Sequence, residues 1–453
     1  FIVPADGTLI EAFAAAAKRA DKTQRYRIFI KKGNYVLEGN NTSNQKVCKV
    51  DDKEYAKFAD PTTYLNTPNV SIIGEDMTET IITNKLPDQY KPDGGNIAEG
   101  IGQGDVLCLQ SGATNTYMQN FTIKSAMGDA KGRDIELNDQ SNKTVCKDMC
   151  LWGYQDTYVS NSDRSRFYFE GGLLRGNTDY LCGKGDVFYN KVNLQMCGTG
   201  YLAVPSKPTK YGYIFKDCTI KAEKSGIDGN YTLGRPWGSG TPVALFIDTK
   251  MEAQPSAIGW NEMSGGWPAR FAEYNSMTSK GTVIDLSGRK KTFGDGHANN
   301  PVLTKEEVAQ YTLATVMGST DNWDPTALTE QASAPQNVLI SEGKMTWDDS
   351  QYVLLWAVCK DGKVVDFTTE NHYDNADSTG KWSVRAANEM GGLSEAAEAG
   401  TASAVKEVNQ TMGVTATAYY TLDGTRVNAN YTGTVIKVMT MTDGTVKAVK
   451  VNR

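Results

Sequence analysis

The sequence predicts an all-β protein in which a right-handed parallel β-helix is followed by a C-terminal β-sandwich module and a small β tail. Three observations predict this fold. One convincing amphipathic helix stands near the start, and almost everything after it reads as short strands. A strand-rich unit then recurs through the middle of the chain, and the composition changes after about residue 325.

The helix is predicted over residues 7–20, GTLIEAFAAAAKRA. Its apolar residues recur at helical spacing and form one face, made of Leu9, Ile10, Phe13 and Ala17.

The recurring unit pairs a large or soft apolar residue with an Ile or Leu five positions later. Successive copies lie 28, 23, 20 and 26 residues apart. Such a repeat predicts a solenoid, in which each coil buries its apolar face only by stacking on its neighbours. A β-sandwich also has many short strands, but it predicts hairpin alternation and no repeated motif. The pairs are Met118 with Ile123, Cys146 with Leu151, Phe169 with Leu174, Tyr189 with Leu194, and Phe215 with Ile220.

Length and charge limit the class of protein. The chain has 453 residues, enough for two or three domains with a sizeable core. A formal charge of -6 without a run of Lys and Arg argues against nucleic acid as a partner. No apolar run approaches the roughly 20 residues needed to span a bilayer. The sequence opens at Phe1 without Met or a signal-like segment, so we interpret it as a mature or trimmed chain.

The eight cysteines are spread from Cys48 to Cys359 without a CxxC pair. This pattern predicts neither a zinc ribbon nor a dense disulfide framework. Along an extended strand, Cys146 and Cys150 would lie too far apart to form a disulfide. We expect all eight to act as small buried hydrophobic residues.

Two aspartates share one place in the repeat. Asp156 follows Cys146 by ten residues, and Asp179 follows Phe169 by ten residues. Because neighbouring strands lie about 4.8 Å apart, the two carboxylates should repel and split their ionisations, one anionic and one protonated near neutral pH. Ester or glycoside chemistry requires such a pair. Two solvated turn aspartates are the alternative.

A third element is YTLGRPWGSG, residues 231–240, where proline fixes the backbone between a guanidinium and a large flat ring. Arg235 can hold a carboxylate bidentately and keep it ionised, and Trp237 can stack on a sugar face. Alternatively, Arg-Pro-Trp is a surface turn with the arginine stem packed on an aromatic ring.

Over roughly residues 1–290 these motifs resemble those of the pectin methylesterases, the pectinesterases of carbohydrate esterase family 8, which demethylate homogalacturonan. The matching segments, in family order, are YRIFIKKGNYVLEG, NVSIIGEDMTETIITN, GYQDTY, TDYLCG and LGRPW, and AIGWNEM and FAEYNSM resemble two more. The resemblance implies a parallel β-helix and a carboxylic ester hydrolase that releases methanol from pectin.

The resemblance also implies residue roles. Asp179 would be the nucleophile, and Asp156 the general acid and then the general base. Gln155 would donate to the oxyanion, and Arg235 would hold Asp179. Trp237 would line the galacturonate subsite. Tyr158 and Tyr180 would be further cleft aromatics, with packing inside the solenoid as the alternative.

The sequence departs from the family pattern at several positions. RDIEL puts Arg133 where the family has a second oxyanion glutamine. Arg133 could donate to the oxyanion, bind a neighbouring substrate carboxylate or face solvent. TDYLCG carries Tyr180 and Cys182 in place of two aromatics, and Glu38 stands one step later than the usual acid after Gly33 and Tyr35. We expect altered substrate preference more than lost chemistry.

Other kinds of site receive little support. The two histidines, His297 and His372, lie outside the repeat, which argues against a serine or cysteine catalytic triad in the main domain. We expect both at the surface. GIGQG at 100–104 lacks the strand-to-helix context of a phosphate cradle. No His and carboxylate cluster suggests a metal, so we expect no cofactor.

We predict a catalytic β-helix over 1–325, a linker over 326–334, a fibronectin type III-like β-sandwich over 335–405 with Trp347 in its core, and a hairpin tail over 406–453 with Asp-Gly turns. The tail resembles C-terminal modules of secreted and surface enzymes of some gut-type bacteria. It is a β-appendage or a sorting or anchoring segment. We therefore expect a secreted, periplasmic or cell-surface bacterial protein that acts on pectin as a monomer.

Two alternatives to an active esterase remain at this point. Because Arg133 breaks one motif, the solenoid could bind pectic glycan without turning it over. A β-helix polysaccharide lyase is the poorer alternative, since that chemistry generally uses calcium and a basic residue.

Overall fold

The structure is a computed structural model that describes residues 1–50, 53–85, 105–129, 133, 135–328, 333–349, 353–377, 379–388, 393–401, 414–421, 425–428, 431–441 and 446–452. It divides into two compact units. The first comprises residues 1–331 with 388–392, and the second comprises residues 332–387 with 393–453.

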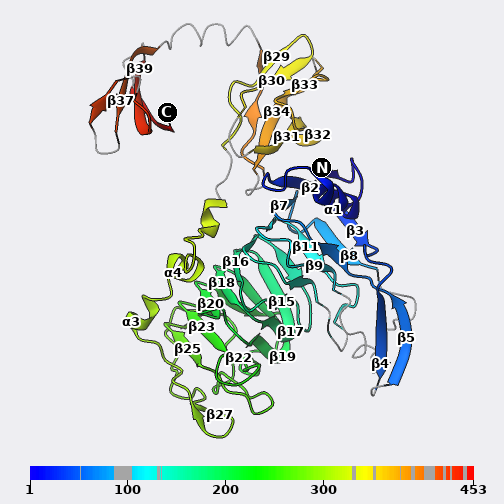
Figure 1. Cartoon of the computed structure of the whole chain (residues 1–453), viewed down its shortest axis with the longest axis vertical. Coiled ribbons are helices and arrows are strands. Elements are labelled where there is room, and N and C mark those ends of the chain that lie inside the picture. The colour runs from blue at the N-terminus through cyan, green and yellow to red at the C-terminus, as the bar shows by residue number, and fades with distance from the viewer. Residues whose placement is uncertain are drawn as a thin grey trace. The chain divides into compact units, whose positions relative to one another are not determined.

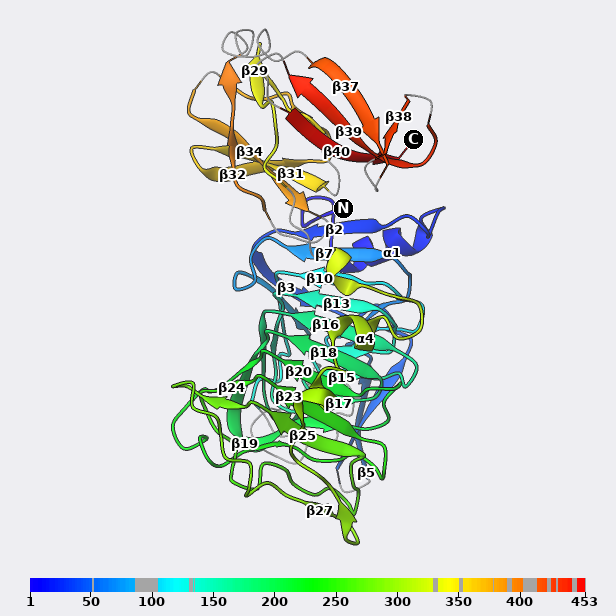
Figure 2. The same ribbon diagram turned by 90° about the vertical axis from the view of Figure 1, so that its left-hand side faces the viewer.

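The first unit is a parallel β-helix whose strands stack as successive coils (Figures 1 and 2). One sheet has ten strands, and all of its neighbouring strands are parallel. In sheet order these are β1 (Ile2–Val3), β2 (Tyr26–Ile30), β7 (Val70–Gly74), β10 (Tyr117–Gln119), β13 (Thr144–Lys147), β16 (Arg166–Glu170), β18 (Asp186–Asn190), β20 (Tyr213–Lys216), β23 (Val243–Ile247) and β25 (Arg270–Tyr274).

The second sheet of this unit has 14 strands in two connected ladders. The first ladder contains β3 (Gly33–Leu37), β8 (Thr80–Asn84), β11 (Thr122–Lys124), β14 (Cys150–Trp152), β17 (Leu173–Gly183), β19 (Asn193–Pro205), β21 (Thr219–Ala222), β24 (Lys250–Met251) and β26 (Met277–Thr278). The second contains β6 (Thr63–Leu65), β9 (Leu107–Leu109), β12 (Leu137–Asp139), β15 (Tyr158–Ser160) and β22 (Thr232–Gly234). The long strands β17 and β19 belong to both ladders, and so join them.

The first unit also has short peripheral elements. They are the hairpin β4 (Gln45–Val50) and β5 (Lys53–Ala59), the pair β27 (Thr292–Phe293) and β28 (His297–Ala298), the helices α3 (Lys305–Val308) and α4 (Leu313–Met317), and the 3₁₀ turn η1 (Pro325–Leu328).

The repeat read from the sequence is confirmed residue by residue. In the ten-stranded sheet, the first members of the five pairs are direct neighbours, from Met118 beside Cys146 through to Tyr189 beside Phe215. In the other sheet, the second members are direct neighbours in the same way, from Ile123 beside Leu151 to Leu194 beside Ile220. All ten side chains are buried in one core. The predicted parallel β-helix is therefore correct.

Aromatic rings extend this ladder along the inside of the coils. The ring of Phe215 stacks between Tyr189, at a centroid distance of 4.5 Å, and Phe246, at 4.2 Å. In both pairs the ring planes are almost parallel, with interplanar angles of 3° and 7°. Equivalent positions on parallel coils force such stacking, because each side chain lies directly above the one before it.

The N-terminal helix α1 (Leu9–Lys18) begins with a capping box between Thr8 and Glu11. Its buried residues are Leu9, Ala12, Phe13 and Ala16. The expected apolar face was therefore partly wrong: Ile10 is half-buried and Ala17 is exposed. The small Ala12 and Ala16 complete the stripe with Leu9 and Phe13 and let the helix approach the core closely.

The second unit contains small sheets that are mainly antiparallel. One has the order β33 (His372–Tyr373), β30 (Lys344–Thr346), β29 (Leu339–Ser341), β36 (Gly400–Thr401), and another has the order β32 (Lys363–Thr368), β31 (Val353–Lys360), β34 (Trp382–Asn388), β35 (Ala397–Glu398). Trp347 is 3% exposed and packs edge-on against Trp356, so the prediction that it is a core tryptophan is confirmed.

The chain ends in a four-stranded antiparallel sheet of β38 (Arg426–Val427), β37 (Val414–Tyr420), β39 (Thr434–Met441) and β40 (Val446–Asn452). The hairpins predicted for this segment are present, whereas their Asp-Gly turns lie outside the described residues. Residues 329–332 of the predicted linker also lie outside them.

Replacement of Phe215 by alanine should lower the free energy of unfolding by about 3–5 kcal/mol, because it opens a cavity between two stacked rings. Urea unfolding of the full chain measures this loss. The matched control is Val36→Ala: this side chain is 59% exposed, and its change should stay within about 0.5 kcal/mol. A Phe215→Ala variant no less stable than that control would contradict the stacking account.

Candidate active site

The two aspartates lie where the repeat is interrupted. Asp156 stands in the loop between β14 and β15, and Asp179 stands within β17, where the register shifts twice between Gly176 and Leu181. On either side of the acids, β17 pairs with β14 and β15 at a constant offset. Asp156 and Asp179 therefore occupy matching positions on adjacent coils. Both have left-handed backbones, with φ of 59° and 52°.

Asp179 is held by a bidentate ion pair. Arg235 donates from Nε to Oδ1 at 2.9 Å and from Nη2 to Oδ2 at 2.6 Å. Both side chains are largely buried, with 10% of Asp179 and 20% of Arg235 exposed. A two-point contact of this kind fixes the orientation of the carboxylate.

Arg235 is supported in turn by Tyr201 of β19, whose ring centre lies 3.9 Å from the guanidinium carbon. Beyond Pro236, Trp237 is anchored through its backbone N–H, which donates to the carbonyl of Pro205 at 3.0 Å. Its side chain is 44% exposed, an unusual state for a tryptophan. The Arg-Pro-Trp segment thus turns one side chain inward to Asp179 and leaves the other at the surface.

Asp156 has the opposite environment. Burial raises the pKa of its carboxyl group to about 6, and the negative charge of Asp179 raises it as well. The positive charges of Arg133 and Arg235 act in the other direction and lower this pKa. The pair therefore combines one carboxylate paired with a guanidinium and one carboxyl group whose pKa is raised to about 6.

Arg133 lies beside Asp156, with its Nε 3.3 Å from Oδ2. Its side chain is 53% exposed, whereas that of Asp156 is 16% exposed. None of the three roles considered from sequence included this ion pair. Its neighbours Lys131, Gly132 and Asp134 lie outside the described residues, as does the GIGQG segment.

Gln155 is half-buried and forms a parallel bridge with Thr178 on the next coil, so it lies directly beside the acid pair. In contrast, the expectation that Tyr158 and Tyr180 line a cleft is wrong. Both side chains are fully buried in the core, and Tyr158 packs edge-on against Phe169 at 4.7 Å. A substrate at the surface cannot reach them.

Sequence reasoning missed Tyr201 and had noted Cys182 only as a departure from the family motif. Tyr201 supports Arg235, but no motif identified it. Cys182 is 4% exposed and lies in a small apolar cluster with Ile135, Val159 and Val204, on which Tyr201 and Met263 pack. Contact with the Cys182 thiol lowers the pKa of the neighbouring Asp156. The cluster supplies part of the apolar surroundings that bury the acid.

The expectation of buried, unbridged cysteines is confirmed for the seven whose side chains are described, which are Cys108, Cys146, Cys150, Cys182, Cys197, Cys218 and Cys359. His297 is exposed and stacks on Trp267 at a centroid distance of 3.6 Å. His372 is half-buried beside Asp374.

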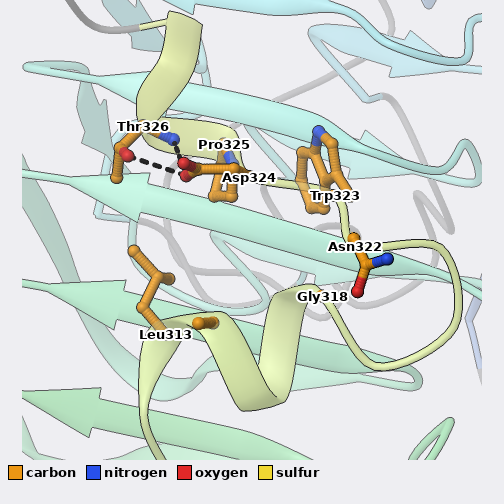
Figure 3. Close-up of a pocket in the computed structure, with 8 residues that line it drawn as sticks. Leu313, Gly318, Asn322, Trp323, Asp324, Pro325 and Thr326 are labelled. Atoms are coloured by element: carbon orange, nitrogen blue, oxygen red, sulfur yellow. Dashed lines mark hydrogen bonds between the residues drawn. The ribbon is translucent and has the colours of Figure 1, made fainter. Parts of the chain in front are cut away.

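A hollow of about 340 Å³ lies elsewhere in the first unit, between α4 and η1 (Figure 3). Trp323, Pro325 and Leu313 line it together with Asp324, which accepts hydrogen bonds from Thr326. None of its lining residues belongs to the acid pair. Within the described ranges, no group of three His, Cys, Asp or Glu side chains is arranged to hold a metal ion, and no helix is long and apolar enough to cross a membrane.

A known protein family matches most of the chain. The family model described as Pectinesterase matches residues 5–320, which include every site residue discussed above. The chain belongs to the pectinesterase family. Pectinesterase 2.1 of Solanum lycopersicum is 24% identical over 330 residues, which cover 69% of this chain and 53% of that protein. Probable pectinesterase A of Aspergillus flavus is 29% identical over 217 residues, which cover 44% and 63%.

The chain spans about half the length of curated pectinesterases such as the Solanum protein. Solved structures agree on the fold. A pectin methylesterase from carrot matches with a TM-score of 0.54 at 18% identity, covering 73% of this chain and 96% of that one. A pectin methylesterase from Yersinia enterocolitica matches with a TM-score of 0.51 at 22% identity, covering 69% and 99%. Both matches cover almost the whole of the solved chain, and they show the shared fold.

The raised pKa of Asp156 predicts a pH-dependent effect on stability. An acid whose folded-state pKa exceeds its unfolded value binds its proton more tightly when folded, so stability falls as pH rises from about 4 to 6. Asp156→Asn removes this loss. We expect the substitution to stabilise the chain at pH 7.5, by up to about 3 kcal/mol, and to have little effect at pH 3.5.

Thermal unfolding at both pH values measures the difference, with Asp295→Asn as an exposed control. If Asp156→Asn changed stability equally at the two pH values, burial would not raise the pKa of Asp156.

Proposed function

We propose that this pectinesterase-family chain hydrolyses methyl esters of galacturonate units in pectin and releases methanol. The observation that supports this most is the pairing of unlike carboxyl groups on adjacent coils. Asp179 is bound at two points by Arg235, and Asp156 titrates at about 6. A nucleophile needs the first environment, and a group that both gives and takes a proton needs the second.

In the proposed first step, a carboxylate oxygen of Asp179 attacks the ester carbonyl carbon. The carbon–methoxy bond breaks, and the leaving oxygen takes the proton of Asp156, so that methanol departs and a mixed anhydride remains on Asp179. In the second step, Asp156 takes a proton from water, and the resulting hydroxide equivalent attacks the anhydride. The products are the free Asp179 carboxylate, protonated Asp156 and a galacturonic acid group, which then loses its proton to solvent.

The negative charge that develops on the carbonyl oxygen needs donors. We assign this role to Gln155, which stands next to Asp156 and opposite Thr178. Arg133 is the second candidate donor, because its guanidinium lies beside the group that handles the proton. Trp237 offers an exposed ring on which a galacturonate unit can stack. The pectin substrate is the one named for the carrot and Yersinia structures.

The remaining parts of the chain are assigned by resemblance. Residues 1–325 would be the catalytic domain, 326–334 a linker and 335–405 a fibronectin type III-like module, in line with the small sheets and the tryptophan core of the second unit. Residues 406–453 would sort or anchor a secreted, periplasmic or cell-surface bacterial enzyme. We propose a monomer that acts without a cofactor.

The direct test is methanol release from highly methyl-esterified pectin by the full chain. An esterase releases methanol and leaves the glycan backbone intact. Unsaturated oligosaccharides would indicate a lyase, and binding without any product would indicate a glycan-binding solenoid. Either result would overturn the proposal.

Asp179→Asn should reduce methanol release by at least about 10³-fold, because it removes the nucleophile and keeps the shape of the side chain. Binding of pectin, measured by calorimetry, and the melting temperature should stay close to wild type. The control is Asp295→Asn, an exposed aspartate outside the site. Substantial residual turnover by the Asp179 variant would reassign the nucleophile.

Arg133 gives a second test, because charge and hydrogen bonding can be separated there. Arg133→Ala should raise the pKa of Asp156, since its lowering charge is lost, and should move the alkaline limb of the rate profile to higher pH. If Arg133 also donates to the oxyanion, turnover should fall on the order of 10²-fold.

Arg133→Gln should then restore turnover but not the wild-type pH profile, because an amide donates without charge. An effect on the apparent KM alone, confined to partly de-esterified pectin, would assign Arg133 to substrate carboxylates. Wild-type kinetics from Arg133→Ala would exclude both roles.

A further inference from the structure

One row of loop positions runs across successive coils next to the active site. The backbone N–H groups of Asn161, Lys184, Ser206 and Trp237 each donate to the coil before, at 2.7, 2.6, 2.6 and 3.0 Å. Ser160, Gly183 and Pro205, which precede three of them, are direct neighbours in the sheet. The row therefore begins at the exposed ring of Trp237 and continues over three earlier coils.

Three cations lie on these loops, and we call Arg164, Lys184 and Lys207 the cationic row. Lys184 is half-buried, and Arg164 and Lys207 are exposed. Lys207 pairs with Asp163 at 2.7 Å. The hydrogen bond from Lys207 lowers the pKa of Asp163, and the charges of Lys207, Arg164 and Lys184 lower it further, so each of the three cations lies near this one carboxylate. Neighbouring coils are about 4.8 Å apart, and three coils span roughly 10 Å.

The acids nearby do not cancel this charge. Asp163 has one carboxylate for three cations. Asp186 is fully buried and accepts hydrogen bonds from the backbone N–H groups of residues 210–212. Within the described part of the chain, Arg164 and Lys184 form no salt bridge. A surplus of positive charge therefore stands at the surface of a chain whose formal charge is -6.

The cationic row lies near the proposed active site. Lys184 follows Asp179 by five residues, so their backbones lie at most roughly 17 Å apart at about 3.3 Å per extended residue. Trp237 follows Arg235, the partner of Asp179, by two residues. The cationic row therefore runs beside the acid pair and ends next to Trp237, so a polymer bound at these two points has the row as its neighbouring surface.

We propose that the cationic row binds the carboxylates of a de-esterified galacturonan stretch. This inference rests on the proposed function, because each methyl ester that is hydrolysed adds one negative charge to the polymer. Fully methylated pectin is neutral and gains nothing from the row, whereas the product gains a charge pair for each carboxylate that reaches a cation. The row would favour substrates that already carry free carboxylates and would retain product.

The test is calorimetric binding of polygalacturonate, which has no ester, to the full chain. The variant is Arg164→Ala/Lys184→Ala/Lys207→Ala, and the matched control is Lys18→Ala/Lys221→Ala/Lys280→Ala, which removes three exposed charges elsewhere. We expect the row variant to bind on the order of tenfold more weakly, with a shallower dependence on salt, and the control to bind like wild type.

Equal affinity of the row variant and wild type would overturn the inference. An equal loss in the control would do the same, because net charge alone would then explain binding. Polyglutamate of similar length should bind more weakly than polygalacturonate; equal binding would show a general polyanion surface. Methanol release from fully methylated pectin should be the same in all three proteins. Its absence from wild type would refute the proposed esterase and leave the binding result standing.

Discussion

Parallel backbone hydrogen bonding between coils is the constraint on which the rest of the structure depends. It sets each residue above its equivalent on the previous coil, so an apolar position repeated in the sequence becomes a continuous core. The same constraint acts on polar positions. Asp156 and Asp179 are adjacent because β17 pairs with both β14 and β15 at one offset. A shift of one residue would turn every side chain of that strand to the other face.

Two like charges on adjacent coils are costly unless their environments differ. One carboxylate is matched by Arg235, which is itself supported by the ring of Tyr201. The other is buried near the apolar cluster around Cys182, and its pKa rises to about 6. The same raised pKa is what would let Asp156 give and take a proton in the proposed mechanism.

Much of this arrangement could be predicted from sequence, because register is periodic and periodicity is visible in residue types. The ladders through Met118 and Ile123 and the acid pair followed from spacing alone. Side-chain direction did not follow at the irregular positions. Tyr180 and Leu181 are both buried although they are consecutive, because the register shift between Thr178 and Leu181 breaks the in-out alternation. The spacing of residues also could not show that Arg133 pairs with Asp156. The position of a long, exposed side chain depends on the charges around it in the folded chain and not on the repeat.

The central claim is that Asp179 is the nucleophile and Asp156 only moves protons. Trapping the covalent intermediate tests it most directly. Full-length protein is mixed with a short methyl-esterified oligogalacturonide in the presence of hydroxylamine, which converts an activated carboxyl group into a hydroxamate, and the peptides are examined by mass spectrometry. The account predicts a substrate-dependent hydroxamate at Asp179 and none at Asp156. A hydroxamate at Asp156, or methanol release with an unmodified Asp179, would contradict it.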